Sequence, residues 1–236
     1  MTKMLKNKFT DILTDDKSGS LKIGEKTLNL LEDCLNNKKR ELADYFLRII
    51  HENFKSMAVI KKIYHELSQN YDLNKITELK EKINSNQFLQ NYNDLFKNKI
   101  TIMTISNSSS IIELLKQQSE SVKNVYCLHS LPGGEGIELM KQLHSNEMKA
   151  EVIDDFEAST YIQNVDLCLI GADLVTDEFV INKIGSLQLA LLAKFYEKKI
   201  VAVFNDLKYI SSDKLENLEI DYLFEKIPTN LIDTLS

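Results

Sequence analysis

The sequence predicts a mixed α/β protein, in which an all-helical N-terminal domain is followed by a Rossmann-like domain built on a parallel sheet. Residues 1–98 show apolar side chains at helical spacing, contain no proline, and hold only Gly19 and Gly24 among the glycines. From residue 99 onward, short apolar runs alternate with helical segments, which is typical of a parallel sheet covered by helices. We therefore expect a helical domain over residues 1–98 and an α/β domain over residues 99–236.

The helices of the first part follow from its apolar spacing. Apolar residues recur at positions i, i+3, i+4 and i+7, which places them on one face of a helix. Four such stripes are present: Leu28, Leu31 and Leu35; Leu42, Tyr45, Phe46 and Ile49; Ile60, Ile63, Tyr64 and Leu67; and Ile76, Leu79 and Ile83.

The strands of the second part follow from its short apolar runs. These runs cover residues 100–105, 125–128, 152–153, 165–170, 179–181 and 200–204, and helical patterns lie between several of them, at 111–116 and 187–196. Five of the seven glycines fall between Gly133 and Gly185, where the turns of such a sheet are expected. We therefore expect the strands to form one parallel sheet flanked by helices.

Composition excludes several classes of function. The net charge of −6 is concentrated after residue 98, and an acidic main domain disfavours direct binding to nucleic acid. No apolar run approaches the roughly 20 residues of a membrane span, and the first ten residues are too polar for a secretory signal. Cys34, Cys127 and Cys168 lie far apart in apolar runs, without metal-type spacing. We expect a cytoplasmic protein with reduced core cysteines, no membrane contact, no metal and no cofactor.

The first of three polar strand-to-helix junctions follows residue 105. Ser106, Asn107 and Ser108 precede a helical segment, and Ser110 with Glu113 matches a capping box. Exposed N–H groups and hydroxyls at a helix start can hold a phosphate, so Asn107 and Ser108 are candidate ligand-binding residues. The simpler alternative is a well-capped helix without a ligand.

The second junction is the segment H-S-L-P-G-G-E-G at residues 129–136. Gly133 and Gly134 would let a ligand approach the backbone closely, although paired glycines also serve any tight turn. The segment lacks the full spacing of a dinucleotide fingerprint or of a Walker P-loop. His129 is a weaker candidate, because a single histidine is more often structural than catalytic.

The third junction is the segment I-G-A-D-L-V-T-D-E-F-V-I-N-K-I-G-S at residues 170–186. Asp173 follows a buried strand and is a candidate acid–base residue. Asn182 and Lys183 precede the next helix, where they could hold a hydroxyl and a phosphate. Because the carboxyl ends of parallel strands share one edge of a sheet, we expect all three junctions to meet in a phosphosugar pocket. Asp154 and Asp155 end a strand at the same edge, with a solvated loop pair as the simpler alternative.

Several of these segments together resemble a known family. G-A-D at 171–173 with N-K-I-G-S at 182–186 is similar to a G-A-D…N-K-I-G-T block, and residues 129–136 are similar to an E-S-R-P…E-G segment with Asp155 on a loop aspartate. Lys208 with Tyr209 resembles a Lys–Phe pair, and Pro228, Leu231 and Ile232 resemble a closing T-P-x-x-L-I. These motifs belong to the family that unites the alpha, beta and delta subunits of translation initiation factor 2B with isomerases of methylthioribose 1-phosphate and ribose 1,5-bisphosphate. The resemblance covers roughly residues 99–233.

The resemblance assigns roles to particular residues. Asp173 takes the position of the catalytic Asp of the isomerases, and Ser106 takes the position of their catalytic Cys. A serine hydroxyl is a poorer proton donor or base than a thiol. Leu131 replaces the arginine of E-S-R-P, which removes a bidentate phosphate contact, and His129 replaces its Glu.

Two functions are therefore open. One is a protein that binds a phosphosugar or nucleotide and has a regulatory or oligomer-forming role. The other is an isomerase that converts an aldose 1-phosphate to a ketose 1-phosphate with Asp173 as the acid–base residue. The resemblance also implies a homodimer or a higher homo-oligomer.

Overall fold

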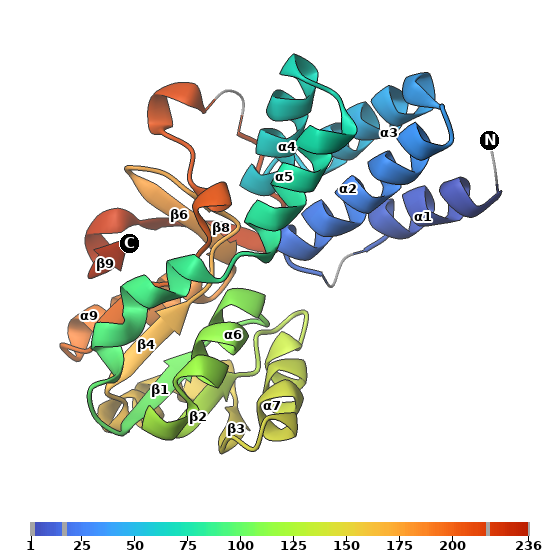
Figure 1. Ribbon diagram of the computed structural model, residues 1–236. Coiled ribbons are helices and arrows are strands. Elements are labelled where there is room, and N and C mark those ends of the chain that lie inside the picture. The colour runs from blue at the N-terminus through green and yellow to red at the C-terminus, as the bar shows by residue number, and fades with distance from the viewer. Residues whose placement is uncertain (1–2, 16–17, 216–217, 236) are drawn as a thin grey trace.

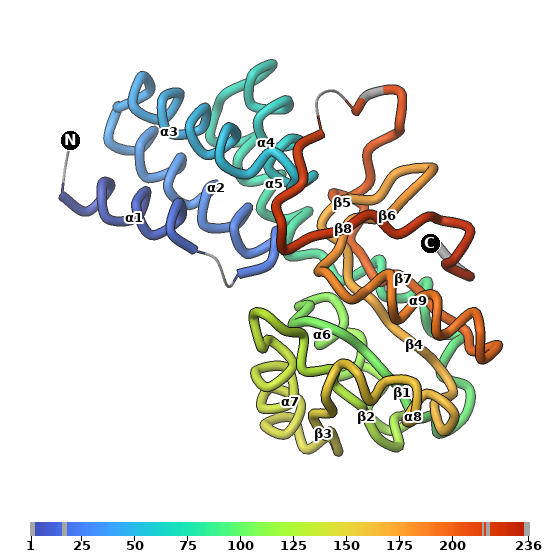
Figure 2. The backbone as a smooth tube through the Cα atoms, turned by 180° about the vertical axis from the view of Figure 1, so that it is seen from behind, coloured from blue at the N-terminus to red at the C-terminus, as the bar shows by residue number. Residues whose placement is uncertain are grey.

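The computed structural model describes residues 3–15, 18–215 and 218–235, and its elements form two lobes (Figure 1). One lobe consists of the N-terminal helices α1 (Lys3–Leu13), α2 (Ser20–Asn36), α3 (Arg40–Asn53), α4 (Ala58–Gln69) and α5 (Leu73–Asn84). The other lobe contains a parallel sheet, its covering helices and a small antiparallel sheet. Helices α1 and α3 lie farthest from the sheet, and α4 and α5 lie nearest to it (Figure 2).

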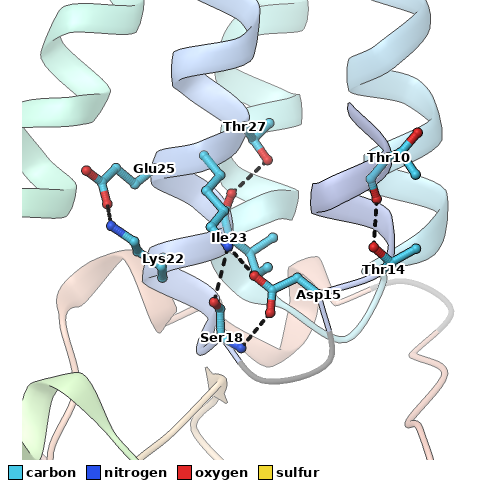
Figure 3. A network of polar contacts seen from close by, with 9 residues as sticks. Thr10, Thr14, Asp15, Ser18, Lys22, Ile23, Glu25 and Thr27 are labelled. Atoms are coloured by element: carbon cyan, nitrogen blue, oxygen red, sulfur yellow. Dashed lines mark hydrogen bonds and ion pairs between the residues drawn. The ribbon is translucent and has the colours of Figure 1, made fainter. Parts of the chain in front are cut away.

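The N-terminal helices bury most of the apolar positions that the sequence predicts. Helix α3 differs, because its buried face is Ala43, Phe46, Leu47 and Ile50, and the predicted Tyr45 is 47% exposed. Leu28 and Leu31 of α2 share one core cluster with Ile60 and Ile63 of α4. The chain between α1 and α2 is tied to α2 through Asp15, which accepts a hydrogen bond from the Ser18 N–H at 2.8 Å and pairs with Lys26 (Figure 3). This contact fixes α1 against α2, so that the first helix joins the common core.

The large sheet is parallel and has a Rossmann-like strand order. It contains β1 (Ile100–Thr104), β2 (Val122–Leu128), β3 (Ala150–Ile153), β4 (Leu167–Ile170), β7 (Lys199–Ala202) and β9 (Thr234–Leu235). The strands lie in the order β3-β2-β1-β4-β7-β9, and every pairing between them is parallel. The chain runs outward from β1 to β3 and then continues on the other side from β4. This order confirms the predicted fold class and creates a switch point between β1 and β4.

Both faces of the parallel sheet are covered, because its side chains alternate between two cores. One core contains Met103 and Cys168 and is closed by α8 (Ala158–Tyr161) and α9 (Ser186–Phe195). The other contains Ile102 and Leu169 and is closed by α6 (Ser109–Gln117), α7 (Glu135–Ser145) and the 3-10 segment Gln87–Phe96. Strands buried on both faces explain why the sequence shows continuous apolar runs in place of strict alternation.

One predicted strand lies in a different sheet. Residues 179–181 were expected in the parallel sheet, but β6 (Phe179–Lys183) pairs antiparallel with β5 (Leu174–Val175) and with β8 (Phe224–Pro228). Only a few residues separate β4 from β5 and β5 from β6, which is too short for the crossover that a parallel pairing requires. The chain therefore turns back as a hairpin beside the carboxyl edge of β4.

The two lobes are joined by direct hydrogen bonds. The Ala58 N–H at the start of α4 donates to the Asp173 carbonyl oxygen at 3.2 Å, and Lys62 Nζ donates to the Asp206 carbonyl oxygen at 2.7 Å. Asn205 Nδ2, in the loop after β7, donates to the Lys82 carbonyl oxygen of α5 at 3.2 Å. These bonds place the N-terminal helices directly beside the loops that follow β4 and β7.

The three cysteines lie inside the protein. Cys34, Cys127 and Cys168 are unpaired and buried, and burial raises the pKa of Cys127 and of Cys168 to about 12. Within the described ranges, no helix is both long enough and apolar enough to cross a membrane.

Candidate functional site

The centre of the candidate site is the switch point between β1 and β4. The loop after β1 carries Ser106, Asn107 and Ser108, and the loop after β4 carries Gly171 and Asp173. The two loops are in contact, because a Cβ on Gly171 would lie 2.8 Å from Ser108 Oγ. In open parallel sheets, ligands bind in the crevice outside the carboxyl ends of the strands at such a point.

The loop after β2 is held against the loop after β1. The Ser130 hydroxyl oxygen accepts a hydrogen bond from the Ser106 N–H at 2.7 Å, and the same hydroxyl donates to the Leu128 carbonyl oxygen at 2.9 Å. The Asp155 carboxylate, after β3, accepts from the backbone N–H groups of Ser130 and Leu131, each at 2.8 Å. Asp155 is therefore a structural clamp of this loop, in contrast to the solvated side chain that a loop aspartate suggests.

Two helices begin at these loops. Helix α6 starts at Ser109, and among the described residues no side chain caps it. The predicted capping box is wrong, because Ser110 lies inside the helix with its hydroxyl buried and Glu113 faces Lys116. The N–H groups of the first turn therefore remain available at the positive end of the helix dipole.

Helix α7 begins directly after Gly134, whose φ of 73° lies in the left-handed region. This conformation explains a glycine at this position. Gly136 is required for another reason: a Cβ there would overlap the Leu128 carbonyl oxygen. The paired glycines of the second junction thus act as turn residues, and they bring the start of α7 close to the end of β2.

Asp173 lies beside a buried lysine. Its backbone N–H donates to the Ile181 carbonyl oxygen at 2.8 Å, which starts the β5–β6 hairpin. Lys208, only 4% exposed, donates from Nζ to the Ala172 carbonyl oxygen. Burial lowers the pKa of Lys208, and the Asp173 carboxylate acts in the opposite direction. A buried cation that is bound to the neighbouring Ala172 carbonyl therefore interacts electrostatically with the predicted acid–base residue.

Asn182 and Lys183 already have partners within the chain. Asn182 Nδ2 donates to the Ser186 hydroxyl at 2.9 Å, which links the end of β6 to the start of α9. Lys183 Nζ forms an ion pair with Glu135 Oε1 at 2.6 Å, which links the end of β6 to the start of α7. Lys183 thus reaches the second junction, as a shared pocket requires.

The structure brings most of the predicted site residues together through these contacts. Asn107 accepts a hydrogen bond from Gln142 of α7 at 3.5 Å, and His129 lies 3.6 Å from Asp154. The sequence did not single out Ser130, Glu135 or Lys208 as site residues. Only Lys208 carried a signal, as part of the Lys–Tyr motif, because a serine in a loop and a glutamate in the first turn of a helix are ordinary residues there.

A large open cleft lies elsewhere. It has a volume of about 1400 Å³ and lies between α3, α4 and the loop after β7, lined by His51, Lys62, Tyr64 and Asn205 among others. Its lining cations are balanced by carboxylates such as Glu66 and Asp206. We place the candidate site at the switch point, where polar groups from several strand ends converge. Among the described residues, no group of His, Cys, Asp and Glu is suited to hold a metal ion.

Comparison with known proteins identifies relatives over most of the chain. The model of the Initiation factor 2 subunit family matches residues 39–220. The chain is 24% identical over 241 residues to the ribose 1,5-bisphosphate isomerase of Methanocaldococcus jannaschii, which covers 89% of this chain and 78% of that protein.

Solved structures show the same fold at lower identity. The translation initiation factor eIF-2B of Pyrococcus horikoshii OT3 aligns over 99% of this chain and 94% of that chain, with a TM-score of 0.81 and 18% identity. A chain of the tetrameric eIF2B-beta2-delta2 complex from C. thermophilum aligns over 97% of this chain and 87% of that chain, with a TM-score of 0.71 and 15% identity.

Proposed function

Since this chain belongs to the initiation factor 2 subunit family, we propose that it binds a small phosphorylated ligand, a phosphosugar or a nucleotide, at the carboxyl edge of its parallel sheet, with a regulatory or oligomer-forming role. The observation that supports this proposal most directly is the hydrogen bond between the Ser106 N–H and the Ser130 hydroxyl. It joins two strand-end loops at the switch point, where the sheet topology favours a ligand.

The charge of the pocket matches a phosphorylated ligand. The uncapped first turn of α6 presents N–H groups at the positive end of a helix, and Lys183 adds a cation from β6. Asn107, Ser108, Asn182 and the backbone at Gly133 and Gly134 supply further polar contacts in this proposal. The surrounding domain is acidic, so these local groups would have to hold the anion.

A thermal-shift screen tests the proposal. Ribose, methylthioribose and hexose phosphates are compared with nucleotides, and a binding ligand at 100 times its Kd stabilises the protein by about 2.7 kcal/mol. Lys183→Ala should weaken the shift, because it removes the cation, whereas Lys141→Ala on the exposed side of α7 should leave it unchanged. Equal shifts in both variants would contradict a site at Lys183.

The alternative function is an aldose-phosphate isomerase. The electrostatic interaction of the buried Lys208 with Asp173 favours it, because a cation near a carboxylate is suited to acid–base chemistry, and the Methanocaldococcus relative is named for such a reaction. Ser106 at the position of the family cysteine weighs against it. Incubation with aldose 1-phosphates decides: ketose formation that disappears in Asp173→Asn supports catalysis, and turnover no higher than in that variant rejects it for the substrates used.

We also propose that the chain forms a homodimer through α9. Leu191 is 52% exposed and Phe195 is 78% exposed on this helix, beside an apolar hollow that Leu187 and Leu192 line. Apolar side chains clustered on one exposed helix face mark a protein interface more often than free surface. A relative of the same fold is part of a tetrameric complex, which is consistent with this role.

A further inference from the structure

The ion pair between Lys183 and Glu135 occupies the part of the pocket where the proposed ligand would place its phosphate. Lys183 Nζ lies 2.6 Å from Glu135 Oε1, and the two side chains are 5% and 24% exposed. Lys183 is the cation of the proposed site, and Glu135 is the first residue of α7. An internal carboxylate therefore already satisfies the group that an external anion would need.

The backbone around Glu135 makes room for this carboxylate. It folds back over Gly133, where a Cβ would overlap the carboxylate atoms. It also lies at the N-terminus of an eleven-residue helix, which favours a negative charge. The glycine, the helix start and Lys183 together form a seat for one anionic group.

The seat fits Glu135 incompletely. Its second oxygen, Oε2, is buried, and no hydrogen-bond donor among the described residues reaches it. A buried acceptor without a partner costs about 1–3 kcal/mol, more when it carries charge. Displacement of the carboxylate by a ligand that pairs with Lys183 in its place would recover that cost without leaving the buried lysine uncompensated.

We propose that Glu135 is an internal competitor for the phosphate-binding seat, and that it determines which ligands the pocket accepts. This inference rests on the proposed function. A ligand has to displace the Glu135 carboxylate from Lys183, and a phosphate carries close to two negative charges and three acceptor oxygens against the single charge of the carboxylate. The pocket therefore selects phosphorylated ligands over carboxylated or uncharged ones, because only a phosphate offers Lys183 more than Glu135 does.

Titration calorimetry with ribose 5-phosphate and with inorganic phosphate tests this role. Glu135→Gln removes the competing charge, and we expect both probes to bind at least about fivefold tighter, the lower end of typical coupling between competing sites. Gly133→Ala should weaken the binding of both probes, because its Cβ would fill the space that the carboxylate and the phosphate share. Glu138→Gln, exposed on the next turn of α7, is the matched control and should bind like the wild type.

The outcomes separate the two proposals. Unchanged or weaker binding in Glu135→Gln, with the wild type binding normally, would overturn the competitor role and make the pair purely structural. If no variant binds either probe although all are folded by circular dichroism, the proposed function itself fails. Unchanged or tighter binding in Gly133→Ala would place the phosphate away from Gly133 and would also count against competition for this seat.

Discussion

Gly171 and Ser108 are in contact across the centre of the parallel sheet, where a Cβ on Gly171 would lie 2.8 Å from Oγ and 2.9 Å from Cβ of Ser108. The two residues follow β4 and β1, the strands on either side of the switch point. Their close approach brings the loops after β4 and β1 together at the carboxyl edge of the sheet, where the candidate ligand site lies.

Gly171→Ala should therefore push the two loops apart and destabilise the protein. The added methyl group forces the Ser108 loop to move, and overpacking of this kind costs about 1–3 kcal/mol. Urea unfolding measures the loss. Gly19→Ala is the matched control, because nothing lies within 4 Å of its added Cβ, and its cost as a helix N-cap should stay below about 1 kcal/mol. Equal losses in the two variants would show that the Gly171–Ser108 contact is loose.

The main architecture could be predicted from the sequence because it depends on local patterns. The stripe of Ile60, Ile63 and Leu67 fixes a helix, and the run at 165–170 fixes a buried strand, from spacing alone. β5 has two residues and β8 contains a proline, so neither has a pattern that distinguishes it from a loop. The antiparallel sheet that carries Lys183 was missed for this reason.

The candidate site could be predicted only in part, because its decisive contacts are not local. The position of Asp173, Lys183 and the Ser106 loop at one edge followed from the parallel topology. The pairing of Lys183 with Glu135 spans 48 residues, and the pairing of Ser106 with Ser130 spans 24. No spacing rule connects such residues, so the partners became visible only in the folded chain.

Asp155→Ala should loosen the loop after β2. The variant leaves the Ser130 and Leu131 N–H groups without their acceptor, and Ser130 is buried. An unsatisfied buried donor costs about 1–3 kcal/mol, and urea unfolding should report a loss in that range. Because Ser130 also holds the Ser106 N–H, the affinity for ribose 5-phosphate should fall as well. Asp94→Ala removes an exposed i,i+3 ion pair and should change neither the free energy of unfolding nor the affinity for ribose 5-phosphate. If Asp155→Ala also left both unchanged, Asp155 would not hold the loop after β2 in place.

His51 should make stability fall as the pH is lowered. Burial is the main cause that lowers the pKa of His51 below its ordinary value of 6.5, against the opposing charge of Glu52. As the pH falls, the unfolded chain therefore binds a proton at His51 at a higher pH than the folded protein does. The contribution of neutral His51 to folding stability is present above about pH 6.5 and is lost as the pH falls below that value. The difference in the free energy of unfolding between wild type and His51→Gln, called here the stability gap, should become smaller from pH 7 to pH 5.

Unfolding at several pH values measures this gap. Ser68→Ala, an exposed substitution on α4, is the control, and its gap to the wild type should stay constant over the same range. His51 stacks on Tyr64 at 4.1 Å, so loss of the ring contact lowers the stability of His51→Gln at every pH. Only the change with pH reports the titration, and a gap that stays constant would refute the assignment to His51.

The proposed dimer depends on the outer face of α9. This helix buries Leu189, Ala190 and Ala193 against the sheet, while Leu191 and Phe195 project from the other side. Burial of about 1,200–2,000 Å² is typical of a stable interface, and exposed side chains of this size next to an apolar hollow can supply its centre.

Light scattering should report a dimer at micromolar concentration for the wild type and a monomer for the double variant Leu191→Asp, Phe195→Asp, because two buried carboxylates without partners are strongly unfavourable. Leu73→Asp, 41% exposed at the start of α5, is the matched control and should remain dimeric. A monomeric wild type would contradict the proposed dimer. If the double variant remained dimeric, the interface would have to lie on a face other than that of α9.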